Sequence, residues 1–252
     1  MPEFRSRKAL VNPELRRRGI YLLPNLFTTA ALFAGFYAIV QAMTDRFEQA
    51  AVAIFIAMIL DGLDGRVARL TRTQSAFGAE YDSLSDMVSF GVAPALVMFE
   101  WAMKGMGKWG WIAAFIYCVG AALRLARFNT NIEVIDKRFF QGLPSPAAAA
   151  LVAGFVWVLI DLNYTGEEVR WYAWALTIFA GVTMVSNFRY YSGKDINLRR
   201  SVPFIAVLAI VLFFVLVSSY PPGILFALFL CYAFSGYVMA VLDWVRRRKT
   251  PA

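Results

Sequence analysis

The sequence predicts an all-α membrane protein, a polytopic bundle of about eight transmembrane helices. Hydrophobic residues make up 60% of the 252 residues and charged residues only 17%, whereas a soluble globular chain is usually about 45–50% apolar and about 25% charged. The apolar residues are gathered into blocks of roughly 17–22 residues, the length of a helix that crosses a bilayer. A large soluble protein with buried helices is the alternative, but it does not require this regular pattern of blocks.

The expected spans follow from the polar segments that interrupt the apolar blocks. Pro24 stands just before the first block and suits the start of a helix. Residues 127–144 and 190–200 are polar and are expected to be loops, and residues 220–223, with two prolines, are expected to be a tight turn. The spans are expected at about residues 25–43, 49–70, 81–103, 109–126, 145–162, 171–187, 202–218 and 224–244.

The basic residues predict the orientation of these spans. Eight spans place both termini on one side of the membrane. The opposite side then holds only four of the 25 lysines and arginines, namely Arg46, Lys104, Lys108 and Arg170. Because loops rich in lysine and arginine stay in the cytoplasm, we expect both termini, and the segment between the second and third spans, to be cytoplasmic. This distribution indicates topology and does not indicate nucleic-acid binding.

The composition of the two ends divides the chain into three parts. Residues 1–20 hold six basic residues. They either lie as an interfacial helix on anionic headgroups or form a leader that only fixes the orientation, and we expect no cleavable signal peptide there. Residues 201–252 are expected to form two C-terminal transmembrane helices and a basic tail, which leaves residues 21–200 as the main membrane domain.

The stretch DGLDGRVARLTRTQSAFGAEYDSLSD, residues 61–86, holds the side chains most suited to chemistry. Asp61 and Asp64 are spaced i,i+3, and Asp82 and Asp86 are spaced i,i+4, so each pair lies on one face of a helix. A helix hairpin would bring the two pairs together. Carboxylates at the ends of membrane helices are costly, and the alternative is that these four only cap helices or carry surface charge.

Four carboxylates around one centre would repel one another unless divalent cations neutralise them. The chain has no histidine, so a metal site must use oxygen ligands, which suits Mg²⁺, Mn²⁺ or Ca²⁺. For the same reason a general base must be a carboxylate, lysine, tyrosine, cysteine or water. Two ions would match four carboxylates, and such a pair suits displacement at phosphorus.

The same stretch resembles a known family. Written as Asp61-x2-Asp64-Gly65-x2-Ala68-Arg69-x8-Gly78-x3-Asp82-x3-Asp86, it matches the signature of the CDP-alcohol phosphatidyltransferases at all eight positions. Eight specified positions at fixed spacing make this a strong motif. The segments 23–29, 89–94, 124–129 and 140–146 resemble the membrane-embedded phosphatidylserine synthases of that family, and the resemblance covers roughly residues 16–200.

The resemblance implies a reaction and a set of site residues. The reaction is transfer of the phosphatidyl group from CDP-diacylglycerol to the hydroxyl of L-serine, which gives phosphatidylserine and CMP. It implies two divalent ions, Mg²⁺ or Mn²⁺, with Asp61, Asp64 and Asp82 as ligands and Asp86 as both a ligand and the general base. Spacing alone does not distinguish Asp86 from the other three. The residues that match CDP-diacylglycerol contacts are Asn25, Thr28, Gly65, Arg69 and Ser75.

The resemblance also implies a homodimer, and we expect it in the bacterial inner membrane with its active site facing the cytoplasm. The serine carboxylate would need its own partner. Arg127, with Asn129 nearby, is the candidate because it enters the cytoplasmic face just after the fourth span and a guanidinium suits a planar carboxylate. The alternative is that Arg127 only marks topology or snorkels to the membrane surface.

Two other functions remain open from the sequence. A sister enzyme that uses glycerol 3-phosphate or an inositol phosphate would need more clustered basic residues, because its acceptor carries a phosphate. A divalent-metal transporter could also use four aspartates at a membrane boundary.

Overall fold

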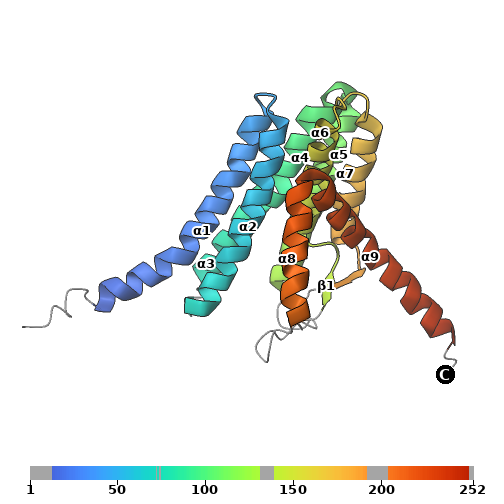
Figure 1. Ribbon diagram of the computed structural model, residues 1–252. Helices are drawn as coiled ribbons and strands as arrows, with labels where there is room; N and C mark the ends of the chain where they lie inside the picture. Colours follow the sequence, from blue (N-terminus) through green and yellow to red (C-terminus); the bar gives the residue numbers. More distant parts are fainter. Residues whose placement is uncertain (1–12, 72, 74, 131–138, 192–203, 250–252) are drawn as a thin grey trace, which may run out of the picture.

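The computed structural model describes residues 13–71, 73, 75–130, 139–191 and 204–249, and most of these residues are helical. The helices lie side by side in a bundle (Figure 1). The start of α1, the end of α9 and a pair of short strands lie at one end, which we call the strand end; the turns at 43–46 and 162–169 lie at the opposite end. The α-helices are α1 (Pro13–Ala42), α2 (Phe47–Thr71), α3 (Ala76–Asp86), α4 (Ala93–Met98), α5 (Lys108–Thr130), α6 (Ser145–Asp161), α7 (Arg170–Val185), α8 (Phe204–Ser219) and α9 (Pro221–Lys249).

Several helices have the length and apolarity of membrane spans. Within the described ranges, four helical segments meet both criteria, at Leu23–Ala42, Ala76–Met106, Lys108–Thr130 and Pro221–Val245, and two shorter apolar helices lie at Ser145–Asp161 and Val207–Ser219. The predicted class, a polytopic helical membrane protein, is therefore confirmed. The count of eight spans and the side on which the termini lie stay predictions.

Each predicted span coincides with helix, although several helices run four or five residues further: the third begins at Ala76 instead of about 81, and α5 ends at Thr130 instead of about 126. The largest differences lie near prolines. α1 begins at Pro13 and continues through Pro24, so the prediction that a helix starts after Pro24 is wrong. Pro24 lacks an amide hydrogen and therefore cannot donate the backbone hydrogen bond to the carbonyl one turn earlier in α1. The part of α1 before it diverges from the bundle in Figure 1. At the other proline-rich site, α9 already begins at Pro221, because proline suits the first turn of a helix. The predicted turn at 220–223 therefore contracts to Tyr220.

Two predicted loops contain strands instead. β1 (Phe139–Gln141) pairs antiparallel with β2 (Arg189–Tyr191), and Phe140 lies opposite Tyr190. Aromatic residues favour strands, and Tyr190 is fully buried, with its hydroxyl donating to the Ala233 carbonyl of α9 at 2.8 Å. The pairing therefore fastens both segments to α9. Of the remaining residues of the predicted loops, 127–130 belong to α5, 142–144 lead into α6, and 131–138 and 192–200 lie outside the described residues.

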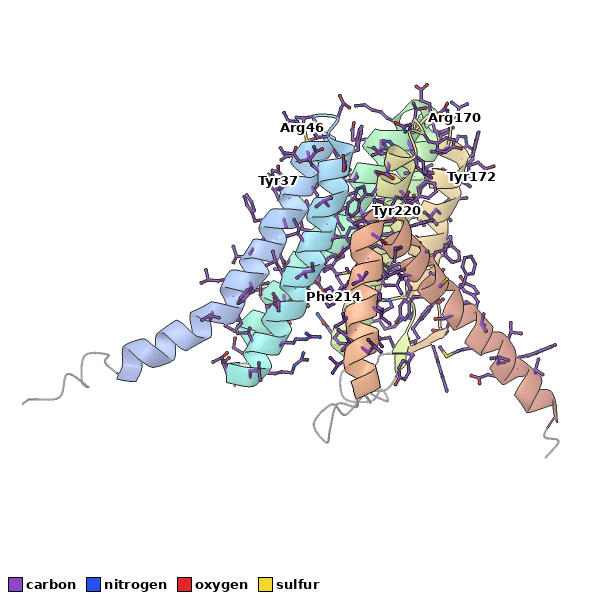
Figure 2. The ribbon with its side chains drawn as sticks, viewed as in Figure 1. Tyr37, Arg46, Arg170, Tyr172, Phe214 and Tyr220 are labelled. Carbon is purple, nitrogen blue, oxygen red and sulfur yellow. The ribbon has the colours of Figure 1, made fainter. Side chains whose placement is uncertain are left out.

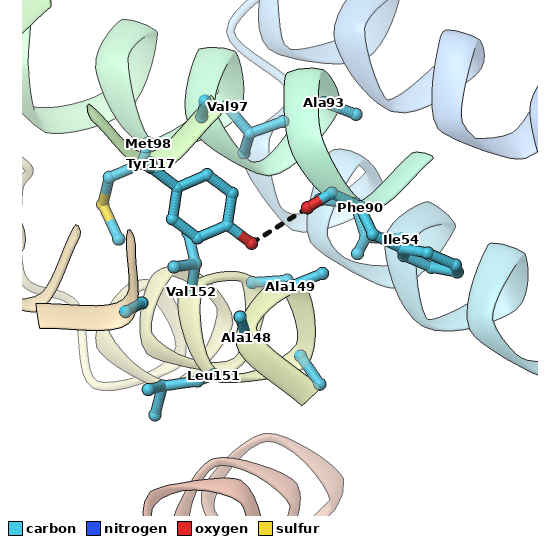
Figure 3. Close-up of a cluster of buried hydrophobic side chains, with 14 of the residues drawn as sticks. Ile54, Phe90, Ala93, Val97, Met98, Tyr117, Ala148, Ala149, Leu151 and Val152 are labelled. Atoms are coloured by element: carbon cyan, nitrogen blue, oxygen red, sulfur yellow. Dashed lines mark hydrogen bonds between the residues drawn. The ribbon is translucent and has the colours of Figure 1, made fainter. Parts of the chain in front are cut away.

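The third predicted span is one helical rod with irregular turns. After α3 it passes through the π-helical segment η1 (Met87–Val92), α4, the π-helical segment η2 (Phe99–Met103) and the short 3₁₀ helix η3 (Lys104–Met106). Pro94 lies one turn after Phe90 and cannot donate an amide hydrogen to its carbonyl. The buried Tyr117 hydroxyl of α5 donates to that carbonyl instead, at 3.0 Å (Figure 3). This bond satisfies a buried acceptor and joins the rod to α5.

The centre of the bundle is α6, whose small side chains let its neighbours approach closely. Ala148, Ala149 and Ala153 are fully buried, and α6 packs against α2, α4, α7 and α9. Small residues are typical of helix interfaces inside membranes, where van der Waals contact drives association. This packing fixes the start of α6 at the strand end, where it takes part in the candidate site.

The opposite end carries aromatic residues and charges on its surface. Arg46 and Arg170 lie there, far from the strands (Figure 2). Trp109, Trp171 and Tyr172 are 57%, 60% and 72% exposed. Exposed tryptophan and tyrosine at one level of a helical bundle are typical of a membrane–water interface.

Candidate functional site

The four aspartates lie where α2 and α3 meet at the strand end. Asp61 and Asp64 belong to the last turns of α2, and Asp82 and Asp86 to α3, with only residues 72–75 between the two helices. One oxygen each from Asp61, Asp64 and Asp82 lies within 4.8 Å of the others. Asp86 faces Asp61 and Asp82 closely enough to interact with both. The structure thus brings together the two pairs that the helical spacing predicted.

Two oxygens of this cluster are buried without a hydrogen-bond partner. Asp82 Oδ1 and Asp86 Oδ1 make no hydrogen bond to any described residue. An uncompensated buried carboxylate oxygen is costly, and carboxylates that cluster need positive charge among them. A divalent cation with oxygen ligands fits these four side chains, since each of them offers carboxylate oxygens. The residues that would hold it are Asp61, Asp64, Asp82 and Asp86.

α1 supports the cluster through one threonine. The Thr28 hydroxyl lies 2.6 Å from Asp64 Oδ2 and 3.2 Å from the Pro24 carbonyl. A hydroxyl has a single hydrogen to donate, and the shorter distance favours Asp64. Thr28 and Asp64 are 3% and 5% exposed, so the bond is shielded from water. Thr28 therefore fixes the orientation of Asp64.

Two serines of the third span hold α1 beside the cluster. Ser85 Oγ donates to the Thr28 carbonyl and Ser89 Oγ to the Ala31 carbonyl, each at 3.1 Å. A Cβ added at Gly35 would come within 2.6 Å of Ser89 Oγ, so only glycine allows this approach. The position of α1, and with it Thr28, is set by backbone contacts to the helix that carries Asp82 and Asp86.

A cavity of about 380 Å³ opens beside the aspartates between α1, α2 and α3. A cavity of this size is within the usual range for small-molecule sites. Ser75 caps α3 by accepting from the Gly78 amide at 3.0 Å, which shapes one wall. All five residues predicted to contact CDP-diacylglycerol line this cavity, together with two of the aspartates: Asn25, Thr28, Gly65, Arg69, Ser75, Asp64 and Asp82.

The two residues predicted to hold serine lie apart from each other. Arg127 Nη1 donates to the Val185 carbonyl at 3.0 Å and lies 3.4 Å from Asn187 Oδ1, so it faces the end of α7. Asn129 Nδ2 donates to Ser83 Oγ at 3.0 Å, which places Asn129 beside the aspartate-bearing helix. Among the described contacts, Asn129 approaches the cluster and Arg127 does not.

A different arginine faces the cluster. Arg124, on the same helix as Arg127, lies within electrostatic range of Asp86 and Tyr232. Its Nη1 lies 2.6 Å from Ser145 Oγ at the start of α6. Arg124 is not among the site residues predicted from the sequence, because an arginine near the cytoplasmic end of a span also fits a marker of topology. The signal that could have found it is its position inside the last turns of the apolar block, deeper than Arg127.

A membrane-embedded helical bundle with four clustered aspartates beside a small cavity defines the class of this protein. A model of the family described as "CDP-alcohol phosphatidyltransferase" matches residues 21–185. The chain belongs to this family of transferases.

Within the family, several curated relatives carry one name. A protein of Helicobacter pylori named CDP-diacylglycerol--serine O-phosphatidyltransferase is 41% identical over 181 residues, which is 71% of this chain and 75% of the relative. A protein of the same name from Mycobacterium tuberculosis is 39% identical over 179 residues, 67% of this chain and 60% of the relative. A third, from Saccharomyces cerevisiae, is 40% identical over 141 residues, half of each chain.

Proposed function

We propose that this protein transfers the phosphatidyl group of CDP-diacylglycerol to the hydroxyl of L-serine, with phosphatidylserine and CMP as products. The observation that carries this proposal is the aspartate cluster, in which oxygens of Asp61, Asp64 and Asp82 lie within 4.8 Å of one another, beside the cavity that Gly65, Arg69 and Ser75 line. The shared name of relatives in bacteria and yeast supports serine as the acceptor.

The cluster would hold two divalent cations, Mg²⁺ or Mn²⁺. Asp61, Asp64, Asp82 and Asp86 supply only oxygen, which both ions prefer. When bound, such ions neutralise the charge on the pyrophosphate and on the departing CMP. Thr28 would keep Asp64 in its ligating orientation, because the metal ligands of a protein are usually held by a second group.

The CDP headgroup would occupy the cavity of about 380 Å³, with the acyl chains in the bilayer. Gly65 leaves room for a phosphate close to the helix backbone, since among the described residues an added Cβ there would come within 4.0 Å of the Arg69 guanidinium alone. That guanidinium suits two phosphate oxygens at once. Asn25 and Ser75 offer polar groups to the remainder of the headgroup.

Asp86 would act as the general base. Its buried Oδ1 has no hydrogen-bond donor among the described residues and is free to accept a proton. The serine hydroxyl gives its proton to Asp86 as its oxygen forms a bond to the phosphorus that carries diacylglycerol. The bond from this phosphorus to the CMP oxygen breaks, and CMP leaves with the electron pair. Proton transfer to a positioned carboxylate contributes about 10²- to 10⁴-fold to such a step.

The membrane placement is part of the proposal. The strand end would face the cytoplasm of a bacterial inner membrane, because it holds the connection between α2 and α3, which the distribution of lysine and arginine along the sequence predicts to be cytoplasmic. The lipid-borne CDP group and the soluble amino acid would then meet at the membrane boundary. We propose a homodimer as the functional unit, on the resemblance to the family.

An acceptor panel with purified protein tests the function. CMP release from CDP-diacylglycerol is measured with L-serine, glycerol 3-phosphate or an inositol phosphate, each with Mg²⁺ or Mn²⁺. We expect release with L-serine, its loss on chelation with EDTA, and its return when either ion is restored. Release with glycerol 3-phosphate and none with L-serine would overturn the proposed acceptor while leaving the family assignment intact.

A further inference from the structure

We propose that Arg124 of α5, whose guanidinium lies beside the buried start of α6, binds the carboxylate of the amino-acid acceptor and thereby presents the acceptor hydroxyl to Asp86. This inference rests on the proposed function. It assigns acceptor specificity to a residue other than Arg127, which the sequence favoured for this role.

The contacts of Arg124 leave most of its donors free. An arginine has five N–H groups in a planar fork. In the described part of the chain, one donor atom of Arg124 is engaged, with Nη1 at 2.6 Å from Ser145 Oγ. Ser145 is fully buried, so this bond anchors the guanidinium at a fixed place. The remaining donors can take a carboxylate in two parallel hydrogen bonds.

The surroundings of Arg124 are suited to an anion. It forms no ion pair with any described carboxylate. Its guanidinium also lies beside Ser145, the first residue of α6, and this helix of 17 residues has no acidic side chain in its first turn. The N-terminus of a helix carries a partial positive charge, so a guanidinium placed there is unfavourable by itself. An acceptor carboxylate bound at this point would satisfy both positive groups.

The charge balance of the proposed complex also leaves the positive charge of Arg124 uncompensated. Two divalent cations balance the four aspartates, including Asp86, which is the carboxylate that Arg124 faces. The guanidinium charge then remains for the acceptor. Its nearness to Asp86 places the hydroxyl of a bound amino acid on the side of the proposed base, because serine carries its hydroxyl and its carboxylate on adjacent carbons.

Arg127, on the same helix as Arg124, bonds to the end of α7 instead of facing the aspartate cluster. Its Nη1 donates to the Val185 carbonyl, and Asn187, which it approaches, also accepts from Gln141 Nε2 at 2.9 Å. These contacts tie the end of α5 to the end of α7 and to β1. Arg127 therefore joins elements of the fold, whereas Arg124 faces the cluster.

The experiment measures acceptor selectivity in the full-length protein. CMP release is followed against the concentration of L-serine and of L-serinamide, which lacks the carboxylate, for wild type, Arg124→Gln and Arg124→Lys. We expect Arg124→Gln to raise KM for serine by ~10- to 100-fold, since a hydrogen-bonded charge contributes about 1.5–3 kcal/mol. We expect the preference of wild type for serine over serinamide to disappear. Arg124→Lys keeps the positive charge but lacks the planar fork of N–H groups. Its KM for serine and its selectivity should therefore lie between those of wild type and Arg124→Gln.

Two controls separate this role from a structural one. Arg170→Gln, at the opposite end of the bundle, should keep the wild-type selectivity. Thermal stabilisation by CDP-diacylglycerol should survive in Arg124→Gln, because the lipid site lies between α1, α2 and α3. If Arg124→Gln does not fold, Arg124→Lys carries the test alone, and an unchanged serine KM in it overturns the inference.

The outcomes distinguish this inference from the proposed function. A wild-type protein without serine-dependent CMP release would overturn the proposed function. An active wild type whose Arg124 variants lose serine and serinamide turnover equally would overturn the inference alone, because Arg124 would then only tune Asp86. Selectivity that disappears in Arg127→Gln and persists in Arg124→Gln would return the role to Arg127.

Discussion

The two ends of the helical bundle differ in how their charged side chains are placed: buried at one end and exposed at the other. At the strand end, Asp82 Oδ1 and Asp86 Oδ1 are buried and have no hydrogen-bond partner among the described residues. At the opposite end, Glu100 and Lys104 form an i,i+4 ion pair at 2.7 Å, and the lysine side chain is 68% exposed. One end keeps costly carboxylates in close contact, whereas the other solvates its charges and pairs them.

This difference between the two ends indicates which residues matter for turnover and which matter little for either turnover or stability. Solvated charges at the opposite end cost the fold little. The clustered aspartates at the strand end destabilise the folded protein, and a bound cation would offset this destabilisation. Changes at the strand end should therefore affect turnover strongly, and changes at the opposite end should affect neither turnover nor stability. The predictions below test that contrast.

The largest effect is expected at the proposed base. Asp86→Asn keeps the shape of the side chain but cannot accept the serine proton, so we expect turnover to fall by about 10²- to 10⁴-fold. CMP release under saturating substrates measures the loss. Binding of CDP-diacylglycerol, followed as a thermal shift, should partly survive. Unchanged turnover would remove Asp86 from its assigned role.

A smaller effect is expected where α1 supports the cluster. Thr28→Val keeps the volume but removes the hydroxyl that lies 2.6 Å from Asp64, and we expect the metal concentration for half-maximal activity to rise about 10- to 100-fold. The matched control is Thr29→Val. The Thr29 hydroxyl bonds to the Asn25 carbonyl and to the Tyr81 hydroxyl instead of an aspartate, so its metal dependence should stay close to wild type. Equal effects of the two variants would contradict the role given to Thr28.

A third change affects stability more than turnover. Tyr117→Phe leaves the buried Phe90 carbonyl without the donor that now lies at 3.0 Å, so we expect a loss of about 1–3 kcal/mol in the free energy of unfolding. Thermal or denaturant unfolding in detergent measures it. Tyr172→Phe, which changes an exposed hydroxyl at the opposite end, should have no measurable effect. A Tyr117→Phe variant as stable as wild type would show that the carbonyl finds another donor.

The smallest effect is expected at the opposite end. Glu100→Gln breaks the exposed ion pair with Lys104, and we expect no measurable change in unfolding temperature or in CMP release, because exposed pairs are screened and cost side-chain entropy. A strong loss of turnover in Glu100→Gln would contradict the separation between the two ends.

The helices were predictable because membrane spans depend on local composition. α6 was expected at 145–162 and lies at Ser145–Asp161, since an unbroken apolar block has few other solutions in a bilayer. The strands were not predictable from short polar segments. β1 pairs with β2, and Tyr190 of β2 is buried against α9, so the strands depend on contacts between residues far apart in the chain.

In the candidate site too, the features set by local sequence were predictable and those set by long-range contacts were not. The meeting of Asp61 with Asp82 followed from helical spacing and a short connection, both of which are visible in the sequence. Arg124 did not follow, because its nearness to Asp86 depends on the rotation of α5 and on where α6 starts. Charge near a span boundary looks the same in the sequence whether it marks topology or faces a ligand.

The contact between Tyr117 and Phe90 also constrains which mutations the chain can accept, and in which order. The hydroxyl at position 117 matters because the Phe90 carbonyl lies where the π-helical segment η1 meets α4, a junction at which Pro94 removes one backbone donor. Loss of the hydroxyl should be harmful in the present chain and nearly neutral after Pro94→Ala. The two positions are therefore expected to be epistatic: replacement of Tyr117 should be selected against while Pro94 is present and tolerated after Pro94 has been replaced.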